Sequence, residues 1–372
     1  MLSLFLTLAL QTAPATVAPA TAELEDLHDV AAHCLGAGGL PGAWIGRVDL
    51  NGLTAAGVAG VRHATTVEPA ELGDRLHLGS CTKAMTAALM AILDQQEVVD
   101  IGGGVAGYLR PLVPNVDPGW EKVTLEHLMV HQGGCPPNLD RFGLLPLQLR
   151  MHKGSAWEGM QLFARGVIKK APAMHFNQKH VYSNAGYTVL GVVLGQTAGR
   201  PYRQLLREEL FAPLGIENFG FGPPDAMPSQ PTGHNQKGNP QAVSDNPPAY
   251  DAAGRVHMPL SEWAKFIAWH LRGFQGDTAI LAKDNFRPLH VPRLDATYAG
   301  GLDVTERSWS KGPILTHAGS NTMWMCVVWM APTEGVAYIA ATNMGGDLAS
   351  RALDSGVSML IQRDRDAGLL PK

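Results

Sequence analysis

The sequence of 372 residues has little charge and no long hydrophobic run, and each shortage excludes a class of protein. Charged residues make up only 17% of the chain, and 29 Lys and Arg against 33 Asp and Glu leave a net charge of −4. Binding to nucleic acid normally requires a basic surface, so we expect no nucleic-acid partner. No stretch reaches the roughly 18 consecutive apolar residues of a membrane-spanning helix, so we expect no stable membrane span.

Cysteine is also scarce, and its spacing is uninformative about metals. The four cysteines, Cys34, Cys81, Cys135 and Cys326, lie far apart and form no CxxC pair, so neither a zinc ribbon nor a thioredoxin-like site is indicated. In an oxidising compartment they could form one or two disulfides, and they could equally be small buried hydrophobic side chains. Both interpretations stay open at this stage.

What the sequence does contain is typical of a turn-rich globular protein. Hydrophobic residues reach 45%, with 42 Gly and 26 Pro, which excludes disorder for most of the chain and also excludes a coiled coil. At about 150 residues per domain, the length suggests two or three domains, or one large domain with an insertion.

The N-terminus predicts export. Leu2 to Leu10 is an apolar run interrupted by Ser3 and Thr7, followed by Ala, Pro and Thr with small residues suited to cleavage. We therefore predict a signal peptide over residues 1–22 and a periplasmic or secreted protein over 23–372. The alternative is a disordered tail with a hydrophobic end, because no Lys or Arg precedes the run.

Both ends of the chain predict hairpins and helices. Asn51-Gly52 joins two apolar runs, which is a strong hairpin signal, and Pro332 to Gly335 separates two others. The expected elements are a helix over 23–35, strands over 43–50 and 53–61, a buried helix over 80–96, strands over 323–330 and 336–342, and a helix over 348–363.

The middle of the chain has short helical patterns between loops, of which 223–248 looks least ordered. We therefore predict an α+β fold in which both chain ends build one antiparallel sheet flanked by helices, with an inserted, mostly helical lobe. The sheet region would comprise about 23–75 and 256–372, and the lobe about 76–255. An active site would lie at the seam between the two parts.

Ser80-Cys81-Thr82-Lys83 places a serine and a lysine one helical turn apart, on the same face of a predicted helix. A serine hydroxyl is a weak nucleophile that needs a base, and a lysine can serve when burial or nearby positive charge lowers its pKa. Alone, this SxxK pattern is a weak signal, because a helix-starting serine followed by a solvated lysine is common.

Tyr182-Ser183-Asn184 lies about 100 residues further along, before an apolar helical segment. A tyrosine beside a cationic lysine ionises more easily, so Tyr182 could exchange the Ser80 proton as one unit with Lys83. Asn184 has both a donor and an acceptor, which suits it to contact Lys83 and a substrate carbonyl.

His317-Ala318-Gly319-Ser320 precedes the apolar strand that begins at Met323. Gly319 in an edge strand would let a substrate backbone approach closely. The amide N–H of Ser320 could join that of Ser80 in an oxyanion hole, and His317 could add charge or hydrogen bonds.

In their order and spacing these three motifs resemble those of the serine β-lactamase and penicillin-binding protein superfamily. The chain is most similar to the branch of class C β-lactamases and D-alanyl-D-alanine carboxypeptidases, whose motifs are SxxK, YxN and a strand-borne KTG or HxG. Further similarities lie at 123–134, at Pro213-Leu214-Gly215 and at Ala341-Thr342-Asn343, so the resemblance covers roughly residues 25–360.

The resemblance implies a role for each motif residue. Ser80 would be the acylated nucleophile, and Lys83 and Tyr182 the proton-transfer pair. The substrate-binding residues would be Asn184, His317, Gly319 and Ser320. The family fold, an antiparallel sheet with helices and a helical lobe, agrees with the fold predicted above.

Three departures from the family pattern bear on the substrate. His317 replaces the lysine usual in class C β-lactamases, which favours carboxypeptidases, D-amino-acid peptidases and esterases. Ala318 replaces a hydroxyl residue that contacts a substrate carboxylate, so the requirement for that carboxylate is weakened. The stretch Ala171 to Val181 lacks the usual Pro-Gly turn.

We therefore predict a serine hydrolase that forms an acyl-Ser80 intermediate from an ester, a D-amino-acid peptide or a β-lactam, and that needs no cofactor. The partner would be a small-molecule or short-peptide substrate, with peptidoglycan fragments among the candidates. Loops 136–150 and 223–248 would decide the substrate, and esterase or peptidase activity is expected ahead of β-lactam hydrolysis. The oligomeric state is not predicted.

Two other functions compete with this one. His127 and His131 stand four residues apart on a predicted helix, as zinc ligands do, although HExxH is absent. A catalytically silent binding protein of the same fold is the other alternative, because folds of this kind can keep a pocket without turnover.

Overall fold

A computed structural model describes residues 23–66, 68–138, 148–149, 151–172, 180–276, 280–294 and 296–371. The predicted signal peptide lies outside these ranges, as do most of loop 136–150 and the centre of the stretch 171–181.

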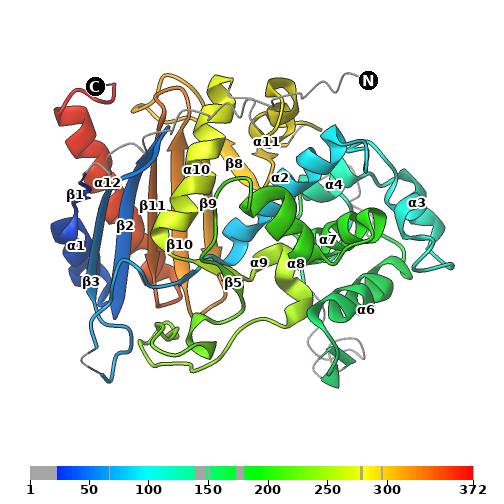
Figure 1. Ribbon diagram of the computed structural model, residues 1–372, viewed down its shortest axis with the longest axis horizontal. Helices are drawn as coiled ribbons and strands as arrows, with labels where there is room; N and C mark the ends of the chain where they lie inside the picture. Colours follow the sequence, from blue (N-terminus) through cyan, green and yellow to red (C-terminus); the bar gives the residue numbers. More distant parts are fainter. Residues whose placement is uncertain are drawn as a thin grey trace, which may run out of the picture.

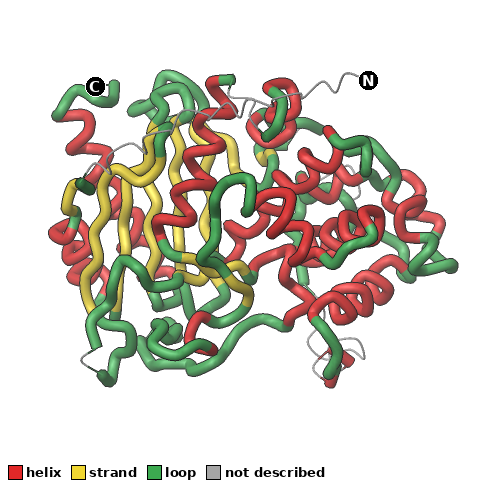
Figure 2. The backbone as a smooth tube through the Cα atoms, viewed as in Figure 1, coloured by secondary structure: helices red, strands yellow, loops and turns green. Residues whose placement is uncertain are grey.

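The strands of the large sheet come from both ends of the chain (Figures 1 and 2). In spatial order they are β1 (Glu25–Asp26), β3 (Gly52–Gly60), β2 (Gly42–Asp49), β11 (Val336–Thr342), β10 (Met325–Ala331), β9 (Ile314–Ser320), β8 (Leu302–Thr305) and β7 (Tyr298–Ala299). Every pair is antiparallel except β1 with β3. The predicted α+β fold is confirmed, since the N-terminal β2 pairs directly with the C-terminal β11.

Helices cover both faces of this sheet. The helices α1 (His28–Gly38) and α12 (Asp347–Asp366) pack on one face, and α10 (Leu260–Gln275) packs on the other (Figure 1). Side chains of β2 alternate accordingly, because Trp44 joins the core under α10 while Ile45 joins the core under α1 and α12. Because β2 is buried on both faces, its sequence is almost continuously apolar and does not alternate with polar residues.

The remaining helices form the lobe beside the sheet (Figure 2). They are α2 (Thr82–Gln95), α3 (Val105–Leu109), α4 (Leu125–Met129), α6 (Ala156–Ile168), α7 (Asn184–Ala198), α8 (Tyr202–Leu205), α9 (Asp251–Gly254) and α11 (Arg287–His290). Two of them, α2 and α7, are apolar on nearly all sides and buried, as such helices must be. A small second sheet, in the order β4 (Leu76–His77), β6 (Val256–Met258), β5 (Gly220–Phe221), lies next to the start of α2.

The first helix was predicted to begin too early. Glu25–Asp26 forms β1 against β3, and α1 starts only at His28, because pairing with the sheet edge competes with helix formation there. The helix also ends later than predicted, at Gly38 instead of residue 35. Gly39 then takes a left-handed conformation, and its N–H bonds the Leu35 carbonyl. Both predicted hairpins and the C-terminal helix are confirmed.

A buried carboxylate fixes α12 to the sheet. Asp364 accepts hydrogen bonds from Arg47 of β2 at 2.9 Å and from the Tyr338 hydroxyl of β11 at 2.6 Å. Its side chain is 4% exposed, so removing this carboxyl group would leave the buried Tyr338 hydroxyl without its acceptor.

All four cysteines are buried free thiols, so the interpretation as small hydrophobic side chains is confirmed. The sulfur atoms of Cys81, in the turn that carries Ser80, and Cys326, in β10, lie 3.6 Å apart. Among the helices in the described ranges, none is both long and apolar enough to cross a membrane.

Candidate active site

Ser80 lies in a short 3₁₀ turn, η1 (Gly79–Cys81), that leads directly into α2. Gly79 before it has φ of 47°, a left-handed conformation that favours glycine. A Cβ at Gly79 would lie 2.3 Å from the backbone nitrogen of Ser320, so any other residue would collide with β9. The glycine thus lets the turn that carries Ser80 press against the end of β9.

Lys83 is fully buried one turn after Ser80. Its Nζ lies 3.1 Å from Ser80 Oγ, 2.7 Å from Asn184 Oδ1 and 2.6 Å from the Ala253 carbonyl oxygen. The SxxK and YxN motifs therefore meet through this amine. The third partner, a backbone carbonyl, has no side-chain signature, and sequence analysis missed it.

The charge state of Lys83 follows from its burial. Because the ammonium has lost its water, the pKa of Lys83 falls to about 7. A neutral amine has two N–H groups and one lone pair. Asn184 Oδ1 and the Ala253 carbonyl can only accept, so they take the two N–H groups, and the lone pair faces Ser80 Oγ, which can donate.

Tyr182 lies against the same amine. Lys83 Nζ is 4.7 Å from the centroid of the tyrosine ring. Burial raises the pKa of Tyr182, and the Ser80 hydroxyl only partly offsets this rise. No described group forms a hydrogen bond of ordinary geometry with the buried Tyr182 hydroxyl. The tyrosine therefore stays a neutral phenol near pH 7 and can pass a proton on, while Lys83 is the group that titrates there.

His131, which sequence analysis considered as a possible zinc ligand, holds Tyr182 in place. Its carbonyl accepts the Val181 N–H at 2.9 Å, and its Nδ1 accepts the Ser183 N–H at 3.0 Å. The two rings lie 4.4 Å apart between centroids. His131 therefore binds the backbone on both sides of Tyr182 and packs on its ring.

Asn184 is placed by the start of α7. Ser183 caps this helix by accepting the Gly186 N–H, and its hydroxyl donates to the Pro136 carbonyl at 2.6 Å. The Asn184 side chain then points its oxygen at Lys83 and its Nδ2 at Asn138 Oδ1, 2.8 Å away.

The C-terminal half of β9 forms a wall beside Ser80. His317 is 6% exposed, and its Nδ1 donates to the Ala318 carbonyl at 2.6 Å. Its Nε2 accepts from the Tyr298 hydroxyl at 3.0 Å. Both ring nitrogens are thus engaged within the protein, so His317 braces the wall, together with Tyr298, which had no sequence motif.

Gly319 has a different reason to be glycine than the one predicted. A Cβ there would lie 2.1 Å from the Leu78 carbonyl oxygen, so the backbone that approaches it belongs to this chain. The strand is also not a simple edge. β8 pairs with 314–316, and within the described strands 317–320 pairs on the β10 side alone.

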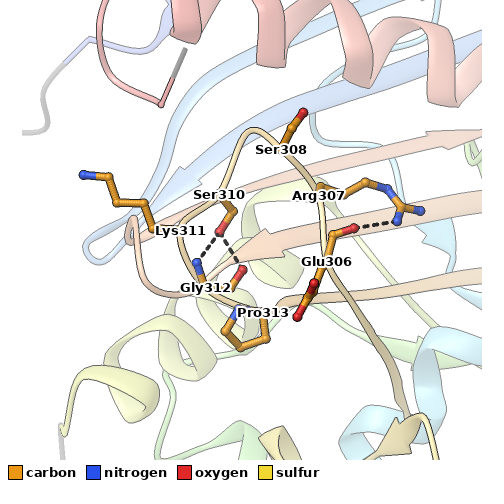
Figure 3. Close-up of a pocket in the computed structure, with 7 residues that line it drawn as sticks. All are labelled: Glu306, Arg307, Ser308, Ser310, Lys311, Gly312 and Pro313. Atoms are coloured by element: carbon orange, nitrogen blue, oxygen red, sulfur yellow. Dashed lines mark hydrogen bonds between the residues drawn. The ribbon is translucent and has the colours of Figure 1, made fainter.

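Two pockets mark the ends of β9. One, of about 550 Å³, has Ser320 in its wall beside Asn235, Gln241, Met323 and Asp347. The other, of about 540 Å³, lies in the loop between β8 and β9 (Figure 3) and is lined by Glu306, Arg307, Ser308, Ser310, Lys311, Gly312 and Pro313. Among the candidate site residues, only Ser320 lines one of these two pockets.

The interpretation of His127 and His131 as helical zinc ligands is wrong. The helix α4 ends at Met129, and His131 follows it with φ of 61°, so the two side chains do not share a helical face. Within the described ranges, no three His, Cys, Asp or Glu side chains come close enough together to hold a metal ion.

Comparison with known proteins identifies the class of this fold and site. The family model described as Beta-lactamase matches residues 27–362, so the chain belongs to the β-lactamase family. The proteins similar to this chain include a penicillin-binding protein and a carboxypeptidase.

Three similar proteins illustrate the range of the match. PbpX of Bacillus subtilis (strain 168), named as a penicillin-binding protein, is 22% identical over 243 residues, 64% of this chain and 56% of PbpX. AmpH of Escherichia coli (strain K12), a D-alanyl-D-alanine-carboxypeptidase/endopeptidase, is 23% identical over 286 residues, 77% of this chain and 68% of AmpH. The crystal structure of a class C β-lactamase from Rhodobacter sphaeroides matches with a TM-score of 0.70 at 16% identity, over 90% of this chain and 99% of that one. The chain thus spans a little over half of PbpX, and the resemblance to the class C and carboxypeptidase branch is confirmed.

The close contact at Gly319 yields a testable prediction. Gly319→Ala should lower the free energy of unfolding by about 1–3 kcal/mol, because the added methyl group meets a backbone oxygen that cannot move independently. Gly36→Ala is the matched control, since a Cβ there meets nothing within 4 Å and alanine favours the helix. Urea unfolding of both variants checks this, and equal stability of the two would contradict it.

Proposed function

We propose that this protein is a serine hydrolase that transfers an acyl group first to Ser80 and then to water. The observation that carries the proposal is the buried Lys83, whose amine contacts Ser80 Oγ, Asn184 Oδ1 and the Ala253 carbonyl at once. A buried amine whose pKa is lowered by the loss of its water is typical of a catalytic base. The substrate would be an ester, a D-amino-acid peptide or a β-lactam, and the reaction calls on no cofactor.

In the acylation step, neutral Lys83 takes the proton of Ser80 while Ser80 Oγ bonds to the substrate carbonyl carbon. The amide N–H groups of Ser80 and Ser320 would stabilise the negative oxygen that develops. As the bond to the leaving group breaks, the Tyr182 phenol gives its proton to that group and regains one from the Lys83 ammonium. Asn184 orients the amine and binds the substrate amide.

In the deacylation step, water replaces the serine hydroxyl. Tyr182 and Lys83 would remove the proton of the water as it attacks the ester carbonyl, and the same pair would return a proton to Ser80. Atoms balance, because one water is consumed and one acyl group is released as a carboxylic acid.

The setting of this activity is part of the same proposal. With the predicted signal peptide over 1–22, the protein would act after export, in the periplasm or outside the cell. AmpH acts by name as a D-alanyl-D-alanine carboxypeptidase and endopeptidase, which supports peptidoglycan-derived peptides as one substrate class.

Covalent labelling tests the nucleophile. A fluorescent fluorophosphonate and a fluorescent penicillin should each add one label to the protein, and peptide mass spectrometry should place it on Ser80. Ser80→Ala should abolish labelling while leaving the fold intact by circular dichroism. Absence of an adduct on the wild-type protein, or equal labelling of Ser80→Ala, would refute the acyl-enzyme mechanism.

The lowered pKa of Lys83 predicts the pH dependence of acylation. Because the base must be neutral, the labelling rate should rise about tenfold per pH unit at low pH and level off above about 7, the pKa of Lys83. Burial keeps the pKa of His131 well below 6.5, so this histidine stays neutral and adds no step.

This profile is measured from the rate of labelling by an uncharged fluorophosphonate between pH 5 and 9, with each reaction quenched at timed intervals. His317, whose ring lies 6.1 Å from that of Tyr182 between centroids, is the control histidine, so His317→Gln should keep the midpoint near 7. A midpoint that disappears in His317→Gln would assign the titration to that histidine and refute Lys83 as the base.

The substrate order can be tested through Ala318, which is exposed on β9. It has no hydroxyl to donate to a substrate carboxylate, a charged hydrogen bond of about 1.5–3 kcal/mol. Among p-nitrophenyl acetate, a D-Ala-D-Ala peptide and nitrocefin, we expect the acetate, which has no carboxylate, to have the highest kcat/KM. Ala318→Thr should raise the values for the two carboxylate substrates about tenfold or more. Nitrocefin as the best substrate of the wild-type protein would contradict this order. A labelled Ser80 that turns over none of the three would favour the silent binding protein.

A further inference from the structure

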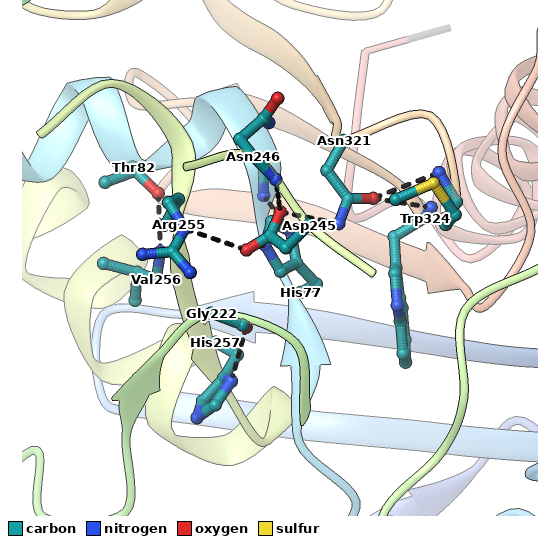
Figure 4. A network of polar contacts seen from close by, with 12 residues as sticks. His77, Thr82, Gly222, Asp245, Asn246, Arg255, Val256, His257, Asn321 and Trp324 are labelled. Atoms are coloured by element: carbon teal, nitrogen blue, oxygen red, sulfur yellow. Dashed lines mark hydrogen bonds and ion pairs between the residues drawn. The ribbon is translucent and has the colours of Figure 1, made fainter. Parts of the chain in front are cut away.

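His77, three residues before Ser80, is completely buried and forms a dyad with a carboxylate (Figure 4). Its Nδ1 accepts the N–H of Gly79 at 3.1 Å, so the proton of this neutral ring lies on Nε2. Nε2 in turn donates to Asp245 Oδ2 at 3.1 Å. The dyad therefore holds the left-handed residue that directs Ser80 towards β9.

The same carboxylate oxygen binds a second segment of the site. Arg255 donates from Nε to Asp245 Oδ2 at 3.0 Å and from Nη1 to Asp251 at 2.8 Å. Two residues earlier, the Ala253 carbonyl accepts the short hydrogen bond from Lys83. Asp245 therefore helps to fix the backbone that orients the catalytic amine.

The other carboxylate oxygen binds a third segment. Asn321 donates from Nδ2 to Asp245 Oδ1 at 3.0 Å, and its own Oδ1 accepts the N–H groups of Met323 and Trp324. Asn321 directly follows Ser320, whose amide is proposed for the oxyanion hole. Figure 4 shows the three segments converging on Asp245 from different elements.

We propose that Asp245 is a positioning residue that holds the turn of Ser80, the carbonyl of Ala253 and the end of β9 at Ser320 in their mutual geometry. This inference rests on the proposed acyl transfer and deepens it. The three segments lie far apart in the sequence, and in each of them one side chain donates a hydrogen bond to Asp245. These side chains are His77, Arg255 and Asn321.

The electrostatics of the carboxylate suit this role. Its side chain is 3% exposed, and burial opposes ionisation. The hydrogen bonds from His77 and Asn321 and the positive charge of Arg255 outweigh this effect and lower the pKa of Asp245. The group is therefore an anion at any pH at which the enzyme would work. Hydrogen bonds to a charged acceptor are stronger than those between neutral groups, so they hold the geometry firmly.

The arrangement of donors makes Asp245→Asn a sharp test. Oδ1 accepts from Asn321 and from the Asn246 N–H, and Oδ2 accepts from His77 and Arg255, so all four partners are donors. An amide must turn its NH₂ group towards one of these pairs. Asn therefore keeps the size of the side chain but must break the contacts on one side.

The experiment compares fluorophosphonate labelling of the full-length wild-type protein and Asp245→Asn, with the maximal rate and the half-saturating concentration measured separately. We expect the maximal rate to fall about 10–100-fold, as small displacements of reacting groups do, with less than about a threefold change in half-saturation. Hydrogen–deuterium exchange of the peptide over 76–81 should become faster, since the Gly79 N–H loses its fixed acceptor.

Asp364→Asn is the matched control, because Asp364 is also a buried carboxylate bonded to an arginine but lies under α12. It should lower stability and leave the maximal labelling rate within about twofold of wild type. Two substitutions of His77 test whether activity depends on an acceptor for the Gly79 N–H. His77→Asn keeps an acceptor for the Gly79 N–H and should retain more activity than His77→Ala, which has none.

The outcomes separate this inference from the function it rests on. An Asp245→Asn protein that labels at the wild-type rate, or that slows only as much as Asp364→Asn, would overturn the positioning role while leaving acyl transfer intact. A wild-type protein that takes up no label would instead overturn acyl transfer, and the inference with it.

Discussion

The burial of Lys83 among three hydrogen-bond partners is the interaction on which the rest of the site depends. A buried ammonium is costly, and its cost is what lowers the pKa of Lys83 to about 7 and makes the amine a base. The two acceptors that share its N–H groups come from α7 and from α9, while Ser80 comes from the turn before α2. The helices of the lobe must therefore pack closely around the amine, or the base would be a solvated lysine. A second close docking brings the turn of Ser80 against β9 of the sheet.

The close docking is made with glycine and with buried polar contacts. Gly79 and Gly319 let the turn of Ser80 touch the end of β9, where any side chain would collide with backbone. His131 binds the backbone around Tyr182, and the dyad of His77 and Asp245 binds the backbone before Ser80. Short polar side chains thus fix backbone segments that the hydrophobic core alone would leave with more freedom.

Much of the fold could be predicted because its signals are local. Asn51-Gly52 specifies a turn by its own backbone preference, and α2 and α7 are apolar on nearly all sides, as buried helices are. The errors arose where a distant contact decided the local structure. Glu25–Asp26 is a strand because β3 offers it an open edge, and His131 leaves the helix because it binds the backbone of Tyr182.

The sequence by itself determined which reactive groups the chain has and which pairs within one motif are neighbours, as with Ser80 and Lys83, since one helical turn sets their separation. Only the tertiary structure decided that the Ala253 carbonyl, Tyr298 and Asp245 belong to the same site, because a backbone oxygen or an isolated side chain has no spacing pattern to reveal it. It also decided why Gly319 must be glycine, since that close approach comes from Leu78, some 240 residues earlier in the chain. The motif suggested that the pKa of Lys83 is lowered. How far it is lowered depends on burial, which is a property of the packed molecule.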